Sequence, residues 1–144
     1  MTGEYSASIR IEAPPDAVFP YLTDADLLVR WMGDRARLEA VPGGRYAVDV
    51  SGVPVRGEFV TVDPPHRVVF TWGALGDDAL PPGCTTVEVV LRADGDGTLV
   101  ELTHRDLPED QVAQHRLGWQ HFLARLAVAA GGGETGTDAG PPAA

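Results

Sequence analysis

Two histidines are the side chains of this sequence best suited to chemistry. His104 lies in a segment where apolar and polar residues alternate, and His115 precedes Trp119 by one helical turn. An imidazole that faces an apolar pocket can act as a general base or hydrogen-bond a ligand. A core histidine satisfied by hydrogen bonds is the alternative. We take both as candidate catalytic and ligand-binding residues, and we expect His66 and His121 to be solvated.

Other chemistries find little support in the sequence. The chain has a single cysteine, Cys84, and no lysine, so it can form neither an internal disulfide nor a lysine Schiff base. No carboxylate is spaced with a histidine and a nucleophile to indicate a triad. Residues 94–97 lack the spacing of a calcium loop and predict a tight turn. We expect no cofactor and no metal; enzymatic activity stays open, with a binding protein favoured.

The charge balance excludes several classes of partner. The 144 residues carry a formal net charge of -10, the wrong sign for a nucleic-acid backbone or an anionic membrane surface. No segment has the run of about 20 apolar residues that a membrane-spanning helix needs. The first residues lack the pattern of an export signal. We expect a cytoplasmic protein that binds neither nucleic acid nor membranes, and a homodimer stays open.

The elements that must position these side chains follow from the spacing of apolar residues. Residues 5–12 alternate and predict a strand, and two short helices are expected over 15–22 and 24–31, the second begun by Thr23 in the spacing of a capping box. Further strands are predicted at 36–40, 45–50, 55–62, 68–72, 84–92 and 99–105. A long amphipathic helix is expected from Asp106 to Ala130, followed by a disordered tail over 131–144. This order indicates an α+β fold in which the last helix covers an antiparallel sheet.

The last helix contains a glycine beside its bulkiest residue. Gly118 stands in the helix interior, where glycine costs about 1 kcal/mol relative to alanine, and Trp119 follows it. A helix that keeps such a glycine has a neighbour pressed against it or a space to leave open. The pair predicts a helix gripped by the sheet, with room between them.

Seven segments carry a family resemblance that covers about residues 5–128. They are Ile11–Phe19, Leu28–Met32, Pro42–Tyr46, Gly57–Trp72, Thr86–Leu91, Thr98–His104 and Gly118–Leu123. They resemble the START-like (SRPBCC, Bet v 1-like) superfamily and, within it, the branch named for the activator of Hsp90 ATPase. The resemblance implies a helix-grip fold: a curved antiparallel sheet of about seven strands around a long C-terminal helix, with a hydrophobic cavity beneath the helix. Members bind lipids, polyketides and other apolar molecules, some are cyclases, and one eukaryotic branch stimulates a chaperone ATPase.

Strand alternation and the helix stripe predict which residues line that cavity. The candidate ligand-binding residues are Trp31, Met32, Tyr46, Val48, Phe59, Val69, Val87, Val89, Leu91, Leu102, His104, His115, Gly118, Trp119 and Phe122. Simple filling of the core is the alternative for each aromatic residue. Phe70 and Trp72 alternate with Val69 and are expected on the other face or at a bulge. Four arginines, Arg30, Arg35, Arg37 and Arg45, could form a positive rim for an anionic headgroup, with a solvated surface as the alternative.

Four functional hypotheses follow for a domain that spans residues 1–130. The favoured one is binding of a small hydrophobic or polyketide-like ligand in a cavity between Trp119 and the strands that carry Phe59, Val89 and His104. A cyclase or hydrolase that uses a cavity histidine is the second. A co-chaperone module for an Hsp90-type chaperone is the third. Antibiotic self-resistance by sequestration of a reactive natural product is the fourth.

Overall fold

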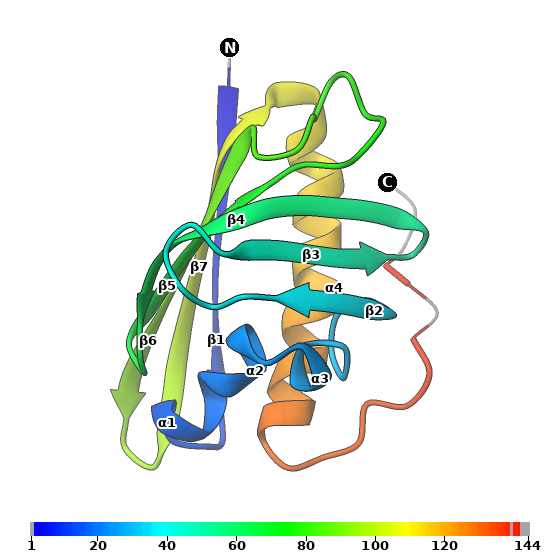
Figure 1. The fold of residues 1–144 in the computed structure, drawn as a ribbon. Helices are drawn as coiled ribbons and strands as arrows, with labels where there is room; N and C mark the ends of the chain where they lie inside the picture. The colour runs from blue at the N-terminus through cyan, green and yellow to red at the C-terminus, as the bar shows by residue number, and fades with distance from the viewer. Residues whose placement is uncertain (1, 139, 142–144) are drawn as a thin grey trace.

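Strands and helices segregate along the chain in the predicted order (Figure 1). The structure, a computed structural model, describes residues 2–138, 140 and 141. The elements are β1 (Thr2–Ile11), α1 (Pro15–Val18), α2 (Pro20–Thr23), α3 (Ala25–Leu28), β2 (Arg35–Leu38), β3 (Arg45–Val50), β4 (Val53–Asp63), β5 (Arg67–Trp72), β6 (Thr85–Asp94), β7 (Gly97–Pro108), the 3-10 turn Glu109–Gln111, and α4 (Val112–Ala130).

The strands form a seven-stranded antiparallel sheet in the order β1-β7-β6-β5-β4-β3-β2. Strands β2 to β7 pair as successive neighbours, and β1 returns to pair with β7 from Thr2↔Pro108 to Ile11↔Thr98. The sheet curves so that β2, β3 and β4 pass across α4 while β1 and β7 lie along it (Figure 1). This is the helix-grip arrangement of the α+β class that the sequence predicts.

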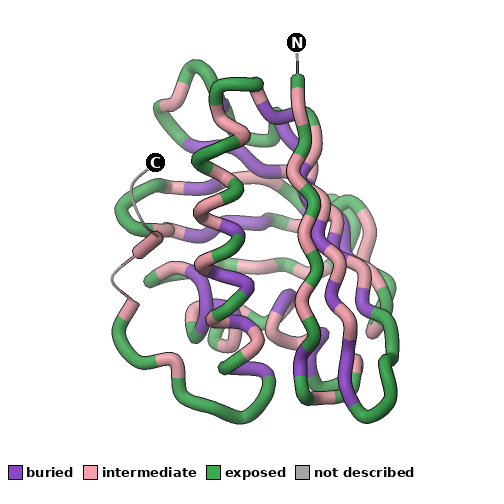
Figure 2. The backbone as a smooth tube through the Cα atoms, turned by 180° about the vertical axis from the view of Figure 1, so that it is seen from behind, coloured by how far each residue is buried: buried purple, intermediate pink, exposed green. Residues whose placement is uncertain are grey.

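Burial alternates along the strands because one sheet face covers the core. In β6, Val87, Val89 and Leu91 are buried while the residues between them are partly exposed. Helix α4 turns a buried stripe toward the sheet and leaves its other side exposed (Figure 2). The stripe contains Trp119, Phe122, Leu123 and Leu126, as predicted. The helix ends at Ala130, where three glycines follow.

The start of α4 differs from the prediction. Residues 106–108 belong to β7, and α4 begins at Val112 instead of Asp106. Leu107 pairs with Gly3 of β1 and is fully buried, so sheet pairing holds this segment extended. Asp106 has a φ of 65° and stands near a register shift between the two strands. Burial and pairing in the sheet therefore override a local helix-start signal.

Proline and aspartate divide the segment after β1 into three short helices, where the sequence predicts two. Pro20 begins α2 directly after α1 because it lacks the backbone N–H that a continuous helix would use. Asp24, rather than Thr23, caps α3. The Asp24 Oδ1 accepts hydrogen bonds from the backbone N–H groups of Asp26 at 2.9 Å and Leu27 at 3.4 Å. The side-chain cap thus lies one residue later than the capping-box spacing predicts.

Strand β5 faces the core with the residues that the sequence assigns to its other face. The Phe70 ring stacks on Tyr46 with centroids 4.0 Å apart, and the Trp72 ring lies 5.2 Å from Trp119. Val69 alternates with them and does not join the core cluster. The prediction that Val69 lines a space beneath α4 is therefore wrong. Alternation could not choose the face, since apolar residues stand on both sides of this strand.

The described part of the tail lies against α4. Arg125 donates to the carbonyl oxygens of Thr135 and Gly136, both at 3.2 Å. His121 is half-buried rather than solvated, and its Nε2 donates to Asp138 Oδ1 at 2.6 Å. The domain boundary at residue 130 and the disordered tail stay predictions, and residues 139 and 142–144 of that tail lie outside the described residues.

Candidate ligand-binding site

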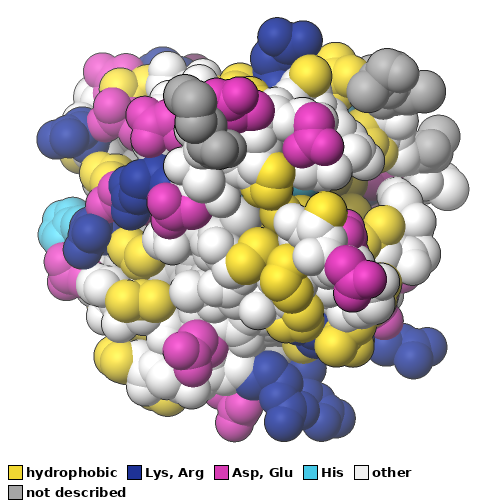
Figure 3. Space-filling model, turned by 90° about the horizontal axis from the view of Figure 1, so that it is seen from above, with side chains coloured by type: hydrophobic (Ala, Val, Ile, Leu, Met, Phe, Trp, Pro, Cys, Tyr) yellow, Lys and Arg dark blue, Asp and Glu magenta, His cyan; other side chains and the backbone are white. Residues whose placement is uncertain are grey.

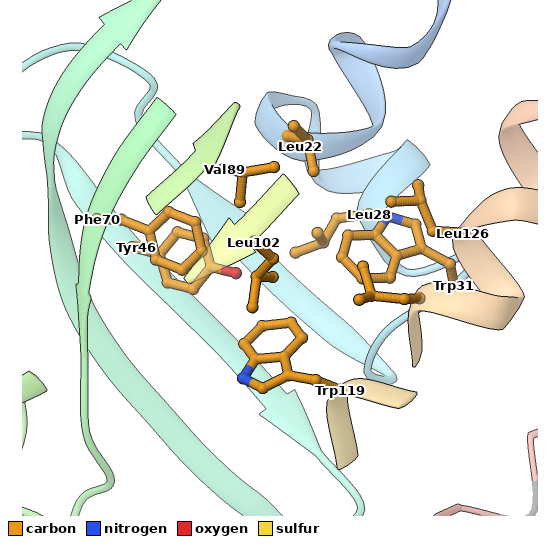
Figure 4. A pocket seen from close by; sticks show the side chains of 10 residues that line it. Leu22, Leu28, Trp31, Tyr46, Phe70, Val89, Leu102, Trp119 and Leu126 are labelled. Atoms are coloured by element: carbon orange, nitrogen blue, oxygen red, sulfur yellow. The ribbon is translucent and has the colours of Figure 1, made fainter. Parts of the chain in front are cut away.

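The inner part of the space between the sheet and α4 is filled. The void that remains there is about 10 Å³, close to the space of one water molecule. Its lining residues, which we call the closed end, are Leu22, Leu28, Trp31, Tyr46, Phe70, Val89, Leu102, Trp119, Leu123 and Leu126. Figure 4 shows the rings of Tyr46 and Phe70 face to face, with Trp31 and Leu126 reaching toward the same space from the other side.

The predicted cavity is therefore not where the sequence places it. Phe59, Val89 and His104 are each at most 2% exposed and belong to the packed interior facing Trp119. The Phe59 ring meets Tyr46 edge-on, with centroids 5.5 Å apart. Aromatic side chains from several strands occupy the volume expected for a ligand, and interiors pack to the density of organic crystals. The prediction failed on side-chain volume, which strand alternation does not report.

A pocket of about 320 Å³ opens at the other end of the same space. It lies between the first half of α4, the turn that joins β3 to β4, and the loop 73–84. Its residues, which we call the open pocket, are Met32, Val50, Ser51, Val53, Val55, Trp72, Ala74, Asp77, Leu80, Gln111, Gln114, His115, Gly118, Trp119, Phe122 and Pro141. Apolar side chains gather on this upper face of the molecule (Figure 3). Volume and lining are those of a small-molecule site.

Gly118 faces this open space. A Cβ atom built on Gly118 would meet no atom within 4 Å, other than its own helix backbone and neighbours. The glycine therefore does not relieve a close contact with the sheet. A mid-helix glycine can be explained by an element packed closely against the helix or by an open space beside it. The structure supports the open space. A larger side chain at this position would project into the open pocket.

His104 is locked in a buried hydrogen-bond chain. Trp119 Nε1 donates to His104 Nδ1 at 3.0 Å, which leaves the proton on Nε2 because an indole N–H can only donate. His104 Nε2 then donates to Thr85 Oγ1 at 2.8 Å, and Thr85 donates to the Trp72 carbonyl at 2.7 Å. Burial, with a smaller effect of His115, lowers the pKa of His104 to about 3. Both ring nitrogens are engaged, so His104 holds α4 on the sheet and has no nitrogen free for a ligand.

His115 keeps a nitrogen available. Its Nδ1 donates to the Gln111 carbonyl oxygen at 2.9 Å, so Nε2 carries a lone pair. Among the described residues no fully buried side-chain nitrogen or oxygen lacks a hydrogen bond, and Nε2 has no protein partner, so it meets the accessible space of the open pocket. Burial lowers the pKa of His115, against smaller raising effects from Gln111 and Asp77. The ring is neutral at pH 7 and offers an acceptor to a ligand hydroxyl.

Comparisons with known proteins agree with this fold. The family model described as activator of Hsp90 ATPase homolog 1-like protein matches residues 12–131. The chain belongs to this family. No match was found among curated proteins.

Three solved structures show how similar its AHSA1-like relatives are. The AHSA1-like protein RHE_CH02687 of Rhizobium etli is 41% identical, with a TM-score of 0.77, over 96% of this chain and 88% of its own. DynU16, a protein of the dynemicin biosynthetic locus, is 25% identical, with a TM-score of 0.79, over 92% of this chain and 48% of its own. PFC0360w, an HSP90 activator from Plasmodium falciparum, is 27% identical, with a TM-score of 0.73, over 89% of this chain and 96% of its own.

The predicted site residues of this AHSA1-like chain divide between the two ends. Those in the open pocket are Met32, His115, Gly118, Trp119 and Phe122. Those at the closed end are Trp31, Tyr46, Val89 and Leu102, together with Trp119 again. Val48, Phe59, Val87, Leu91 and His104 are buried and line neither space. Trp119 is thus the wall between the two ends.

The sequence prediction missed the pocket residues that come from turns, loops and the polar side of α4. Gln114, His115 and Gly118 stand at helical spacing on one side of α4, and Gln111, at the end of the preceding 3-10 turn, continues the same spacing. That stripe of polar residues and glycine was a readable signal. Asp77, expected at a solvated loop tip, is half-buried, and its carboxylate accepts from the backbone N–H groups of residues 79 and 80.

Two further expectations concern charge and metal. The arginines predicted as a rim do not line the open pocket: Arg35, Arg37 and Arg45 line a groove on the outer sheet face, and Arg30 lies near Arg125. Within the described residues no group of three or more His, Cys, Asp or Glu side chains could hold a metal. No helix in that part of the chain is long and apolar enough to cross a membrane.

Proposed function

We propose that this AHSA1-like protein binds a small, polycyclic, largely apolar molecule in the open pocket. The observation that carries the proposal is the 320 Å³ space onto which Gly118 opens. An apolar pocket of this size with a few polar groups that point into it is the usual form of a small-molecule site. Glycine lowers the helix propensity at position 118, and no closely packed neighbour requires it there. A space kept open for a ligand explains why the helix contains this glycine.

The lining defines the chemistry of the ligand. Trp72, Trp119 and Phe122 offer flat apolar surfaces that suit fused aromatic rings. His115 Nε2 accepts a hydrogen bond, so a ligand hydroxyl is the matching group. Gln114 adds a side-chain amide on the same side of the pocket. A hydroxylated polycycle of the polyketide type combines both features.

The relatives support this reading and one alternative. DynU16 belongs to a biosynthetic locus for a natural product, dynemicin, which is compatible with binding or sequestering such a molecule. PFC0360w is an HSP90 activator, so stimulation of a chaperone ATPase is a second candidate function. Adding the purified chain to an Hsp90 and measuring ATP turnover tests it, and an unchanged rate rejects it. A cytoplasmic location and a homodimer stay predictions.

Catalysis would rest on His115, since His104 has no free nitrogen. Screened compounds that bind should therefore also be followed for chemical conversion by mass spectrometry. Full turnover by a His115→Ala variant would reject a catalytic histidine. Binding without conversion would leave the ligand-binding proposal intact.

A matched pair of variants at Gly118 tests the proposal. Wild type, Gly118→Ala and Gly118→Leu are compared in a thermal-shift screen of hydroxylated polycyclic compounds. A saturating ligand should raise the Tm of wild type and Gly118→Ala by about 5 to 10 °C. Gly118→Leu places a branched side chain in the pocket and should remove that shift while remaining folded. Equal shifts in all three proteins, or no shift in wild type with any compound, would refute the proposal.

A further inference from the structure

Four of the eleven arginines line one groove on the outer face of the sheet. The groove has a volume of about 510 Å³ and is lined by Arg35, Arg37, Arg45 and Arg56, together with Ala36, Tyr46, Ala47, Asp49 and Gly57. It crosses β2, β3 and β4. The chain has a formal net charge of -10, and acidic residues also flank the groove: Asp49 lines it, and Glu58 stands opposite Arg45 in the strand register.

The strand register explains how the groove forms. Arg37 of β2 pairs with Ala47 of β3, and Ala47 pairs in turn with Arg56 of β4. The small alanine forms a floor between two long side chains that stand about 10 Å apart across three strands. Arg35 and Arg37 lie two residues apart on the same strand face, about 7 Å from each other. The positive groups thus form a grid with the spacings of a β-sheet.

Part of this positive charge is not neutralised. Arg56 pairs with Asp49 at 3.0 Å, and Arg45 lies 3.9 Å from Glu39. Arg35 and Arg37 form no ion pair with the described residues, although Arg35 stands opposite Asp49 in the strand register. Both are exposed. The groove therefore keeps guanidinium groups whose fork of donors suits carboxylates.

The groove is separate from the open pocket. Tyr46 and Val48 of β3 point into the core, so Arg45, Ala47 and Asp49 between them take the opposite face. A ligand in the open pocket cannot reach these arginines through the sheet. Any molecule bound at the arginine groove would therefore differ from a ligand in the open pocket, and the inference does not depend on the proposed function.

We propose that the arginine groove is a docking surface for an extended acidic segment of a partner protein, with carboxylates at alternate positions. Such a segment presents side chains of one face about 7 Å apart, which matches the spacing of Arg35 and Arg37. A second row of contacts to Arg56 lies across the alanine floor. β2 is an edge strand and only four residues long, so the groove reaches the rim of the sheet. Charge complementarity, rather than apolar burial, supplies the attraction.

A labelled peptide tests this docking surface on the full chain. A fluorescein-labelled peptide of alternating glutamate and threonine is titrated at low salt, and its counterpart with glutamine in place of glutamate serves as the uncharged control. Fluorescence anisotropy measures affinity, and amide chemical shifts locate the contact. We expect the acidic peptide to bind, to shift the amides of β2–β4, and to weaken as salt increases. The glutamine peptide should not bind.

Two charge reversals of equal size separate this surface from general electrostatics. Arg37→Glu changes the centre of the groove, and Arg116→Glu changes an exposed arginine of α4 by the same two charges. Arg37→Glu should weaken peptide binding at least about tenfold, and Arg116→Glu less than about twofold. Equal weakening by both variants, no binding to wild type, or equal binding of the glutamine peptide would overturn the proposal. Inorganic phosphate producing the same shifts at the same charge concentration would overturn it as well, since a simple anion site would then suffice.

Discussion

The two ends of the space beneath α4 differ about thirtyfold in volume, although Trp119 lines both. At the closed end about 10 Å³ remains, and at the open pocket about 320 Å³. The same sheet and helix enclose both ends. The difference comes from which other elements supply side chains.

At the closed end the short helices add the missing volume. Leu28 and Trp31 fill the gap between sheet and helix, and Leu126 meets them from α4. The Trp31 Nε1 donates to the Tyr21 carbonyl at 2.9 Å, which fixes the indole in place. At the open pocket a turn and a loop replace these helices, and α4 contributes Gly118. The open pocket therefore lies where a turn and a loop, rather than helices, flank α4, and where α4 carries a glycine.

The largest effect on stability is expected from a substitution at the closed end. Leu126→Ala should lower the free energy of unfolding by about 3 kcal/mol, since Leu126 is fully buried and its loss leaves a cavity. Denaturant unfolding measures the change. Ligand affinity at the open pocket should stay within about twofold of wild type once both proteins are folded. A large loss of affinity would show that the two ends do not act independently.

The next effect concerns His104, which ties the two ends together through Trp119. The pKa of His104 falls from 6.5 in the unfolded chain to about 3 in the folded one. Below pH 6.5 the unfolded chain binds a proton that the folded chain excludes, so stability falls as the pH drops from 6.5 toward 3. The free energy of unfolding should therefore be about 2 kcal/mol lower at pH 5 than at pH 7 because of this one group.

Replacement of His104 by a residue that does not titrate isolates this effect. His104→Gln keeps a donor and an acceptor but should lose about 2 kcal/mol less between pH 7 and pH 5 than wild type does. Unfolding free energies measured at both pH values give the difference. Identical pH slopes for the two proteins would contradict a neutral, buried His104.

A smaller effect should appear at the acceptor of the open pocket. His115→Phe keeps a ring but removes Nε2, so the affinity for a hydroxylated ligand should fall by about 1 kcal/mol, close to fivefold. The same ligand without its hydroxyl should bind both proteins equally. Calorimetric titration of the four combinations measures the coupling. A loss of affinity that does not depend on the hydroxyl would show that His115 contributes shape alone.

The smallest effect is on the stability of α4 itself. Gly118→Ala should raise the free energy of unfolding by about 0.5 to 1 kcal/mol, because alanine restricts the unfolded chain and its Cβ meets open space. Denaturant unfolding in the absence of ligand measures it. Destabilisation would mean that Gly118 is needed for packing and that the space beside it is smaller than described.

The periodicity of apolar residues predicted the fold, because the fold depends on the order of strands and helices along the chain. The alternation in residues 84–92 and the stripe from Trp119 to Leu126 are properties of single segments and can be read locally. The start of α4 was not readable, since burial of Leu107 against β1 joins residues that are far apart in the sequence. Local signals thus failed where a distant strand decided the outcome.

The site could be predicted only in part, for the same reason. Gly118 and His115 were identified because a glycine or a histidine in an apolar helix is unusual by itself. The position of the cavity was wrong, since it depends on how completely side chains from opposite sides, such as Tyr46 and Trp31, fill the interior (Figure 4). The hydrogen bond of Trp119 to His104 also depends on geometry alone. Pocket residues from turns carried no periodic signal.

The most direct measurement of the central claim is the location of a bound ligand by NMR. With any compound that raises the Tm of wild type, intermolecular NOEs identify the protons it touches. The account predicts NOEs to the Gly118 Hα and to the indoles of Trp72 and Trp119, with none to Leu28 or Leu126. NOEs to Leu28 and Leu126 would contradict it, because the ligand would then occupy the interior that the structure shows as filled.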